Sequence, residues 1–395
     1  MLLLALLFAA PQPISLADAF ARATQANPDV AAARLNVRVA EAGIRSAGQL
    51  ANPIVSGSYG PDAPTWIGTI GVKLPVLGQR GTAVAAAERE RDLARAEVAT
   101  KELTVQAAVR RAYFALAAAQ AQAQFAAEAT RLALELEQLS TRKFETGSAP
   151  RLEVEQATVT RRQAQQDQID REAATSTAQV DLGKLLGVED ELQTQDALLP
   201  IPAAPPLEQL LARAAQHPEV QTFRRQQDAA LARAQRERAA VRPLPDVALA
   251  FQGGEPPGAV HDPTQPKIGL RYTLAFELPI LSWNGGRIGA EEAQASVAAS
   301  QATAAAQRLR NEIRAARARW DAASRRARAY TEELVPASLR LLEMARTGYQ
   351  LGRAPLISVL QAQGEVTAAR VKGVDAASEA QKAFADLEEA AGETF

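Results

Sequence analysis

The chain carries one unit of sequence twice, and this duplication limits its fold more than any other feature. Three short landmarks recur in the same order at nearly constant spacing: residues 147–150 as 352–355 after 205 positions, 74–77 as 278–281 after 204, and 27–30 as 217–220 after 190. Each copy therefore spans about half of the chain, and both copies are expected to fold alike.

Composition favours long helices over ordinary compact domains. Aromatic residues make up 5% of the 395 residues, and Ala dominates the 47% that are apolar. The net charge is −1, from 44 basic and 45 acidic residues, so no bulk attraction to nucleic acid is expected and no nucleic-acid partner is predicted. The sequence has no Cys, which excludes disulfides, zinc–thiolate sites and a thiol nucleophile.

Turn and capping residues divide the chain into two repeats. We expect a first repeat at residues 15–190, a linker at 191–206 and a second repeat at 207–392. Ser15 followed by Asp18 is typical of a helix start in which the two side chains cap the first turn. The predicted helices, in order, cover residues 15–49, 80–145, 150–187, 207–241, 286–350 and 355–391.

In each copy the two shorter helices together are about as long as the long one. They would therefore lie end to end beside it, in a column on the order of 100 Å long. The long helices carry apolar residues at alternating spacings of four and three, as in coiled coils. In the second copy these residues are Leu309, Ile313, Ala316, Trp320, Ala323, Ala327, Tyr330 and Leu334. Pro336 lies inside the second long helix, and a kink is expected there.

Four segments alternate apolar and polar residues with a period of two, which predicts β-strands. In the last of them Leu270, Tyr272, Leu274 and Phe276 share one face, and Thr273 lies on the other. Strands of about this length cross a bilayer when tilted, and the scarce aromatic residues concentrate here, as they do at membrane interfaces. A half-buried sheet in a soluble protein would show the same alternation. The four segments cover residues 52–60, 66–74, 245–253 and 267–278.

Neither the strands nor the helices are complete within one chain. Four strands are too few to close a barrel, and open sheet edges are not tolerated in lipid. The helical hairpins have apolar seams but no core of their own. We therefore expect a mainly α fold with a small β part, in which duplicated coiled-coil hairpins form a trimeric α-barrel continued by a twelve-stranded membrane β-barrel.

The N-terminal segment has the character of a secretion signal. Its first ten residues are apolar, too few to span a bilayer but similar to the apolar core of a signal peptide. We expect residues 1–14 to be the remnant of such a signal, and a buried helical turn is the alternative.

From residue 15 to residue 392 the pattern resembles the TolC family of outer-membrane efflux channels. The resemblance rests on the duplicated order of helix, two strands, helix, turn and helix, on Asn27-Pro28, and on the hairpin tips at 144–147 and 349–352. It also rests on residues 74–81, of which Gly78-Gln79-Arg80-Gly81 is most similar to the heavy-metal branch of cobalt–zinc–cadmium type.

The resemblance implies a passive exit duct of a tripartite efflux system. The expected partners are two further copies in a homotrimer, outer-membrane lipid, a periplasmic adaptor and an inner-membrane pump that expels metal cations or small toxic compounds. The duct would lie in the outer membrane and extend into the periplasm, with Leu270, Tyr272, Leu274 and Phe276 facing lipid. The adaptor would dock at the hairpin tips, at Gly147, Ala149, Pro150, Gly352, Ala354 and Pro355.

The entrance of such a duct maps to one turn beyond each tip. The matching residues are Glu153, Gln156, Ser358 and Gln361. Because three of the four are uncharged, an acidic ring there would come from Glu153 alone or be absent.

The sequence lacks the residues of a catalytic site. Its only histidines are His217 and His261, and neither belongs to a nucleophile–base–acid pattern or a metal-ligand pattern. No enzyme activity, cofactor or metal site is therefore predicted. Two alternatives stay open: an outer-membrane duct for type I protein secretion, and a periplasmic coiled-coil scaffold outside the membrane.

Overall fold

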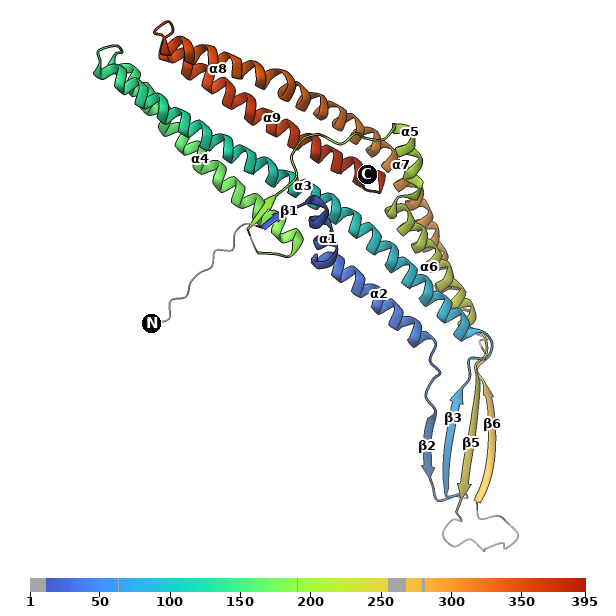
Figure 1. Cartoon of the computed structure of the whole chain (residues 1–395). Helices are drawn as coiled ribbons and strands as arrows, with labels where there is room; N and C mark the ends of the chain where they lie inside the picture. Colours follow the sequence, from blue (N-terminus) through green and yellow to red (C-terminus); the bar gives the residue numbers. More distant parts are fainter. Residues whose placement is uncertain (1–11, 63, 190, 255–267, 279–280) are drawn as a thin grey trace, which may run out of the picture. The chain divides into compact units, whose positions relative to one another are not determined.

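The computed structural model describes residues 12–62, 64–189, 191–254, 268–278 and 281–395. The chain divides into two compact units, each built from both copies of the repeat (Figure 1). Unit 1 contains Met1–Ala32, Ala99–His217 and Ala306–Phe395, and unit 2 contains Ala33–Val98 and Pro218–Ala305. His261, Pro279, Ile280 and residues 1–11 of the expected signal segment lie outside the described residues.

Unit 1 holds two long helical hairpins. The first consists of α3 (Gln79–Glu145), from residue 99 onward, and α4 (Arg151–Leu186). The second consists of α8 (Val335–Gln350) and α9 (Leu356–Ala391), and α8 continues α7 (Gly285–Arg328). Figure 1 shows α3 beside α4 and α8 beside α9.

The first helix of each repeat is broken in two, where the sequence predicts one helix over 15–49 and one over 207–241. The observed elements are α1 (Leu16–Ala26), α2 (Pro28–Ala47), α5 (Leu207–Arg213), a 3-10 turn (Ala214–Gln216) and α6 (Pro218–Ala240). Both breaks precede a proline, because the residue before proline avoids the helical region. Asn27 and His217 accordingly have extended ψ angles of 127° and 138°.

Asn27, at the first of these breaks, caps the helix that follows it. Its side-chain oxygen accepts hydrogen bonds from Asp29 N at 3.0 Å and Val30 N at 3.4 Å, so it caps α2. Its side-chain nitrogen donates to the carbonyl of Leu185 at 3.1 Å, which ties the break to the end of α4. The predicted cap at Ser15 is confirmed, since Ser15 Oγ accepts from Asp18 N at 3.2 Å.

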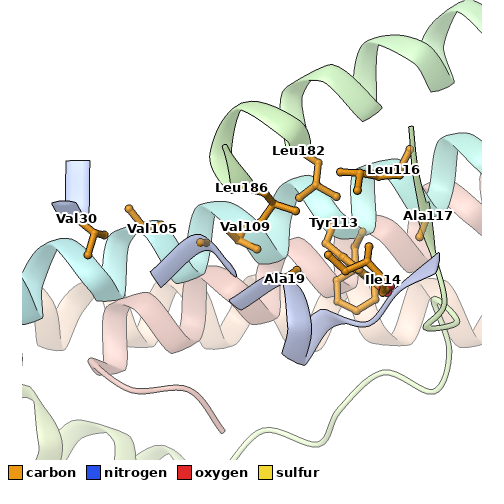
Figure 2. Close-up of a cluster of buried hydrophobic side chains, with 13 residues drawn as sticks. Ile14, Ala19, Val30, Val105, Val109, Tyr113, Leu116, Ala117, Leu182 and Leu186 are labelled. Carbon is orange, nitrogen blue, oxygen red and sulfur yellow. The ribbon is translucent and has the colours of Figure 1, made fainter. Parts of the chain in front are cut away.

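Two short parallel strands, which the sequence does not predict, anchor the start of α1. β1 (Gln12–Ile14) pairs with β4 (Leu192–Thr194). Tyr113 lies beneath them, fully buried, and its hydroxyl lies 2.9 Å from the carbonyl of Ile14 and 2.8 Å from the carboxylate of Asp196. Figure 2 shows the surrounding core, which includes Ile14, Ala19, Val30, Val105, Val109, Tyr113, Leu116, Ala117, Leu182 and Leu186.

The seam of the second long helix is confirmed in its first part and wrong at its end. Leu309, Ile313, Trp320 and Ala327 are buried, but Leu334 is 49% exposed. The reason is a π-helical turn at Ala329–Leu334, which rotates the helix out of its former register just before Pro336. At the site of the expected kink, the helix therefore changes from α-helical to π-helical geometry.

Unit 2 contains one antiparallel sheet in the order β2 (Ile54–Tyr59), β3 (Trp66–Lys73), β5 (Pro245–Gly253) and β6 (Ile268–Phe276). The central pair β3–β5 joins the two copies of the repeat. In the helical part, Arg233 of α6 bridges Glu291 of α7 at 2.8 Å and Glu90 of α3.

Among the helices that the structure describes, none is both long enough and apolar enough to cross a membrane.

Candidate functional site

Each hairpin of unit 1 ends in the same backbone turn. Gly147 and Gly352 have φ angles of 73° and 67°, a left-handed conformation that glycine adopts without a steric penalty. In the first tip Ser148 N donates to Lys143 O at 2.7 Å, and in the second Arg353 N donates to Gly348 O at 2.7 Å. The sequence repeat is therefore also a repeat of the turn.

Pro150 and Pro355, predicted as the first residues of the two return helices, lie one position before those helices. Each is the N-cap of its return helix, with ψ angles of 153° and 158°, and the helices begin at Arg151 and Leu356. The missing N–H of proline still costs no helical bond there. Ala149 and Ala354 complete the two turns by donating from N to the same carbonyls, at 3.2 Å and 3.1 Å.

One tyrosine connects the two hairpins just behind the tips. Tyr349 of α8 donates from its hydroxyl to the carboxylate of Glu153 in α4 at 3.0 Å. Lys143 of α3 donates to the main-chain carbonyl of Tyr349 at 2.6 Å, and its ammonium lies 3.8 Å from the centre of the ring. Burial, then the hydrogen bond to Glu153 and its charge, raise the pKa of Tyr349.

The tyrosine ring also belongs to a small apolar core. It is 3% exposed and packs with buried residues from both hairpins. These are Leu136, Ala157, Leu356 and Val359. The hairpin ends are thus joined by an apolar contact and by two polar contacts on its margin.

The predicted entrance residues divide into two groups. Gln156 and Gln361 line the same open groove, whose volume is about 490 Å³, together with exposed apolar side chains such as Leu152. Glu153 and Ser358 are not among its lining residues; Glu153 is occupied by Tyr349, and Ser358 N donates to Pro355 O at 3.1 Å.

Sequence reasoning missed Lys143 and Tyr349. The signal was present in the duplication: at the 205-residue offset, Tyr349 corresponds to Phe144 and Lys143 to Gly348. The hydroxyl of Tyr349 and the ammonium of Lys143 each occur in one copy only, although both copies share the turn. Such a difference indicates a contact in which the two hairpins contribute different groups.

The sheet of unit 2 has one apolar face. In the register, Leu249 lies opposite both Ile70 and Tyr272, and Phe251 lies opposite Leu270. The four predicted lipid-facing residues share this face and are between 52% and 81% exposed. They are Leu270, Tyr272, Leu274 and Phe276.

The opposite face of the sheet is mainly small and polar. Thr273 and Arg271 of β6 lie on it, opposite Ala248 and Ala250 of β5. Within the described ranges, no group of three or more His, Cys, Asp or Glu residues is placed to hold a metal ion.

The chain matches the family model described as outer membrane efflux protein over residues 20–188 and 210–393. It is 24% identical, over 366 residues, to the cobalt-zinc-cadmium resistance protein CzcC of Cupriavidus metallidurans. The matched region covers 91% of this chain and 85% of CzcC.

Two solved structures share the fold over nearly their full lengths. The chain superposes on CusC with a TM-score of 0.76 and 20% identity, covering 99% of this chain and 96% of that one. It superposes on the outer membrane protein VceC of Vibrio cholerae with a TM-score of 0.72 and 18% identity, covering 96% of each chain. The predicted mainly helical fold with a small sheet part agrees with both.

Proposed function

The chain belongs to the outer membrane efflux protein family, and from this premise we propose that it is the passive exit duct of a tripartite efflux system. Members of this family are channel proteins of the outer membrane rather than enzymes. In the proposed system an inner-membrane pump supplies the energy, a periplasmic adaptor connects pump and duct, and this chain provides a sealed path for the cargo.

The sheet of unit 2 is the observation that carries the proposal. Its apolar face is exposed, and within the described residues β2 and β6 each pair on one side only. Unpaired backbone N–H and C=O groups cost several kcal/mol each in lipid, so such edges must pair with something. Three chains that join β6 of one to β2 of the next close a barrel of twelve strands, with the apolar face toward lipid and Thr273 toward the lumen.

The helical hairpins of the trimer would continue the duct into the periplasm. We assign adaptor docking to the two tips, through Gly147, Ala149, Pro150, Gly352, Ala354 and Pro355. Their support is the identical turn geometry, which presents a similar backbone surface twice in every subunit.

The contacts behind the tips suggest how the periplasmic entrance closes. In the proposed closed state, Tyr349 holds the second hairpin against Glu153 of the first. Gln156, Ser358 and Gln361 would line the entrance without charge, so this duct would lack an acidic ring of cation ligands.

Metal cations are the proposed cargo, and small toxic compounds are the alternative. The support is the likeness to CzcC, which is named as a cobalt-zinc-cadmium resistance protein. Loss of the gene should lower the concentrations of Co²⁺, Zn²⁺ and Cd²⁺ that the cells tolerate, and the gene supplied on a plasmid should restore them. Unchanged metal tolerance with increased sensitivity to organic toxins would reject the metal assignment and keep the duct.

Membrane fractionation tests the duct itself. The protein should be recovered in the outer membrane and, in detergent, should migrate as a trimer that heating converts to the monomer. Recovery as a monomer without detergent would reject the duct and favour the periplasmic scaffold.

A further inference from the structure

We propose that a cavity beside the π-helical turn at Ala329–Leu334 is a binding site for a medium-chain carboxylate, a small molecule with an apolar chain and an anionic head. The site lies within unit 1 and does not depend on the proposed duct function. The volume and the walls of the cavity fit the chain, and Arg370 fits the head.

The cavity has the size and the walls of a site for an apolar chain. Its volume is about 340 Å³, and its walls are mainly apolar. Phe125 of α3, Leu339 of α8 and Val374 of α9 line it. Leu198 and Leu199, from the segment between the two repeats, also line it. The cavity has room for about eleven groups the size of a water molecule, at roughly 30 Å³ each, and octanoate has about that many non-hydrogen atoms.

Arg370 places a positive charge at the margin of this apolar cavity. Among the described wall residues it alone is charged, and its side chain is 26% exposed, whereas Gly373 and Ala377 at the base are buried. Its guanidinium lies 5.0 Å from the centre of the Phe125 ring, which keeps the charge beside the wall. A guanidinium has five N–H donors, and the hydrogen bond to Glu128 at 2.7 Å uses Nη1. The remaining donors suit a carboxylate, which guanidinium binds well.

The two copies of the repeat differ at the positions that make this site. The return helices α4 and α9 correspond at an offset of 205 over all 36 residues of each. At this offset Arg370 stands in place of Gln165, and Gly373 stands in place of Gln168. The second copy thus has a charge where the first has an amide, and no side chain where the first has a long one. These two differences supply the group that binds the head and the space for the chain.

The π-helical turn contributes to the opposite wall. Val335 N donates to Tyr330 O, five positions back instead of four, and both Thr331 and Val335 line the cavity. The turn accommodates a residue that the first copy lacks, because the offset is 204 at the buried seam residues Val109 and Ile313 and 205 in the return helices. In the first copy α3 continues as one α-helix. Single π-turns frequently occur at functional sites, in agreement with a ligand site here.

Titration calorimetry with octanoate tests the site on the full-length protein held in an amphipol. Octanoate should bind with saturation, at one site per subunit. Each CH₂ added between hexanoate and octanoate should tighten binding about fourfold, or about 0.8 kcal/mol. Octanol has the same chain without the charge, and it should bind about tenfold more weakly. Equal affinities for octanol and octanoate, or uptake that does not saturate, would overturn the proposal.

Gly373→Leu blocks the base of the cavity and should abolish saturable binding. A Cβ at this position would lie 3.7 Å from Cγ2 of Val335, a wall residue. Gly364→Leu is the matched control, because it adds the same side chain to the same helix where a Cβ meets open space. Uptake of octanoate by the amphipol is the same for both variants, so a difference between them reports this site. Equal binding by the two variants would overturn the proposal.

Arg370→Gln decides the question if Gly373→Leu does not fold. It introduces the residue of the first copy and keeps the apolar walls, so octanoate should bind about tenfold more weakly while octanol binding stays the same. Arg340→Gln is its control, because Arg340 is exposed, follows Leu339 in the sequence and is not a wall residue. If Arg370→Gln binds octanoate as tightly as Arg340→Gln does, the proposal is wrong.

Discussion

The hydroxyl of Tyr349 donates a 3.0 Å hydrogen bond to the carboxylate of Glu153, a polar contact between the outgoing helix of the second hairpin and the return helix of the first. The ammonium of Lys143, on a third helix, lies 3.8 Å from the centre of the same ring. One side chain thus connects α3, α4 and α8 where the proposed entrance lies. The relative position of the two hairpin ends depends on a small number of identifiable groups.

Replacing Tyr349 by Phe should loosen this connection. The variant keeps the apolar ring in its core but leaves the Glu153 carboxylate without its donor, at a cost of about 1–2 kcal/mol. The proposed trimer, reconstituted in planar bilayers, should therefore spend more time in a high-conductance state. Glu153→Gln is the matched control, because it keeps an acceptor for the hydroxyl and should change conductance less. If Tyr349→Phe gives the same conductance record as the unaltered protein, this contact does not hold the entrance closed.

The two faces of β6 should respond oppositely to arginine. Leu274→Arg places a charge on the proposed lipid face and should cost about 2–4 kcal/mol near the middle of the bilayer. The amount of the proposed trimer recovered from the outer membrane should decrease accordingly. Thr273→Arg, on the neighbouring residue of the same strand, should leave assembly intact and alter ion selectivity. Equal tolerance of both substitutions would contradict the barrel.

The strand faces could be predicted because alternation is a local pattern with a fixed period. The register places Leu249 opposite Tyr272 on one face and Ala248 opposite Thr273 on the other, as the alternation requires. The pairing of β3 with β5 is a property of the whole fold, and no local pattern in either strand specifies its partner.

The helix breaks at Asn27 and His217 were missed because apolar periodicity continues across them. Pro28 and Pro218 lie inside the helices predicted over 15–49 and 207–241, and the effect of each proline on the residue before it decides the backbone there. The contact between Tyr349 and Glu153 was also beyond local patterns, since its two residues are 196 positions apart. Comparison of the two copies position by position would have marked Tyr349, because its equivalent Phe144 has no hydroxyl.

Tyr113 should make unit 1 sensitive to alkali. Burial is the main cause that raises the pKa of this phenol to about 12. The folded state therefore keeps a proton that the unfolded chain releases near pH 10, so the stability that it provides is complete below about pH 10 and is lost as the pH rises to about 12. Tyr113→Phe should cost about 1 kcal/mol at neutral pH and remove this alkaline loss. If the unfolding temperatures of the two proteins decrease in parallel between pH 9 and 12, Tyr113 is not the cause of the alkaline loss of stability.

The buried ion pair of Arg110 with Glu388 should be costly to break from one side. Arg110 is 6% exposed and Glu388 is 2% exposed, so the loss of one partner leaves the other charged and buried. Arg110→Ala is expected to destabilise unit 1 by about 3–5 kcal/mol, measured by thermal unfolding of the helices in detergent. The double variant with Arg110→Met and Glu388→Leu removes both charges and keeps the volume, so it should recover most of that loss.

The same pair predicts how the Arg110→Ala deficit depends on pH. Burial raises the pKa of Glu388, and Arg110 opposes that shift, so the arginine's removal should raise the pKa further. A buried carboxyl that is protonated carries no charge, so its burial does not destabilise the folded state. As the pH rises through its folded-state pKa the group ionises, and the destabilisation grows. The deficit of Arg110→Ala should therefore be smaller at acidic pH than at neutral pH, and the double variant should show no such dependence. A deficit that stays constant with pH would mean that lost packing of the arginine against Phe384, whose ring centre lies 4.7 Å from its guanidinium, outweighs the lost charge.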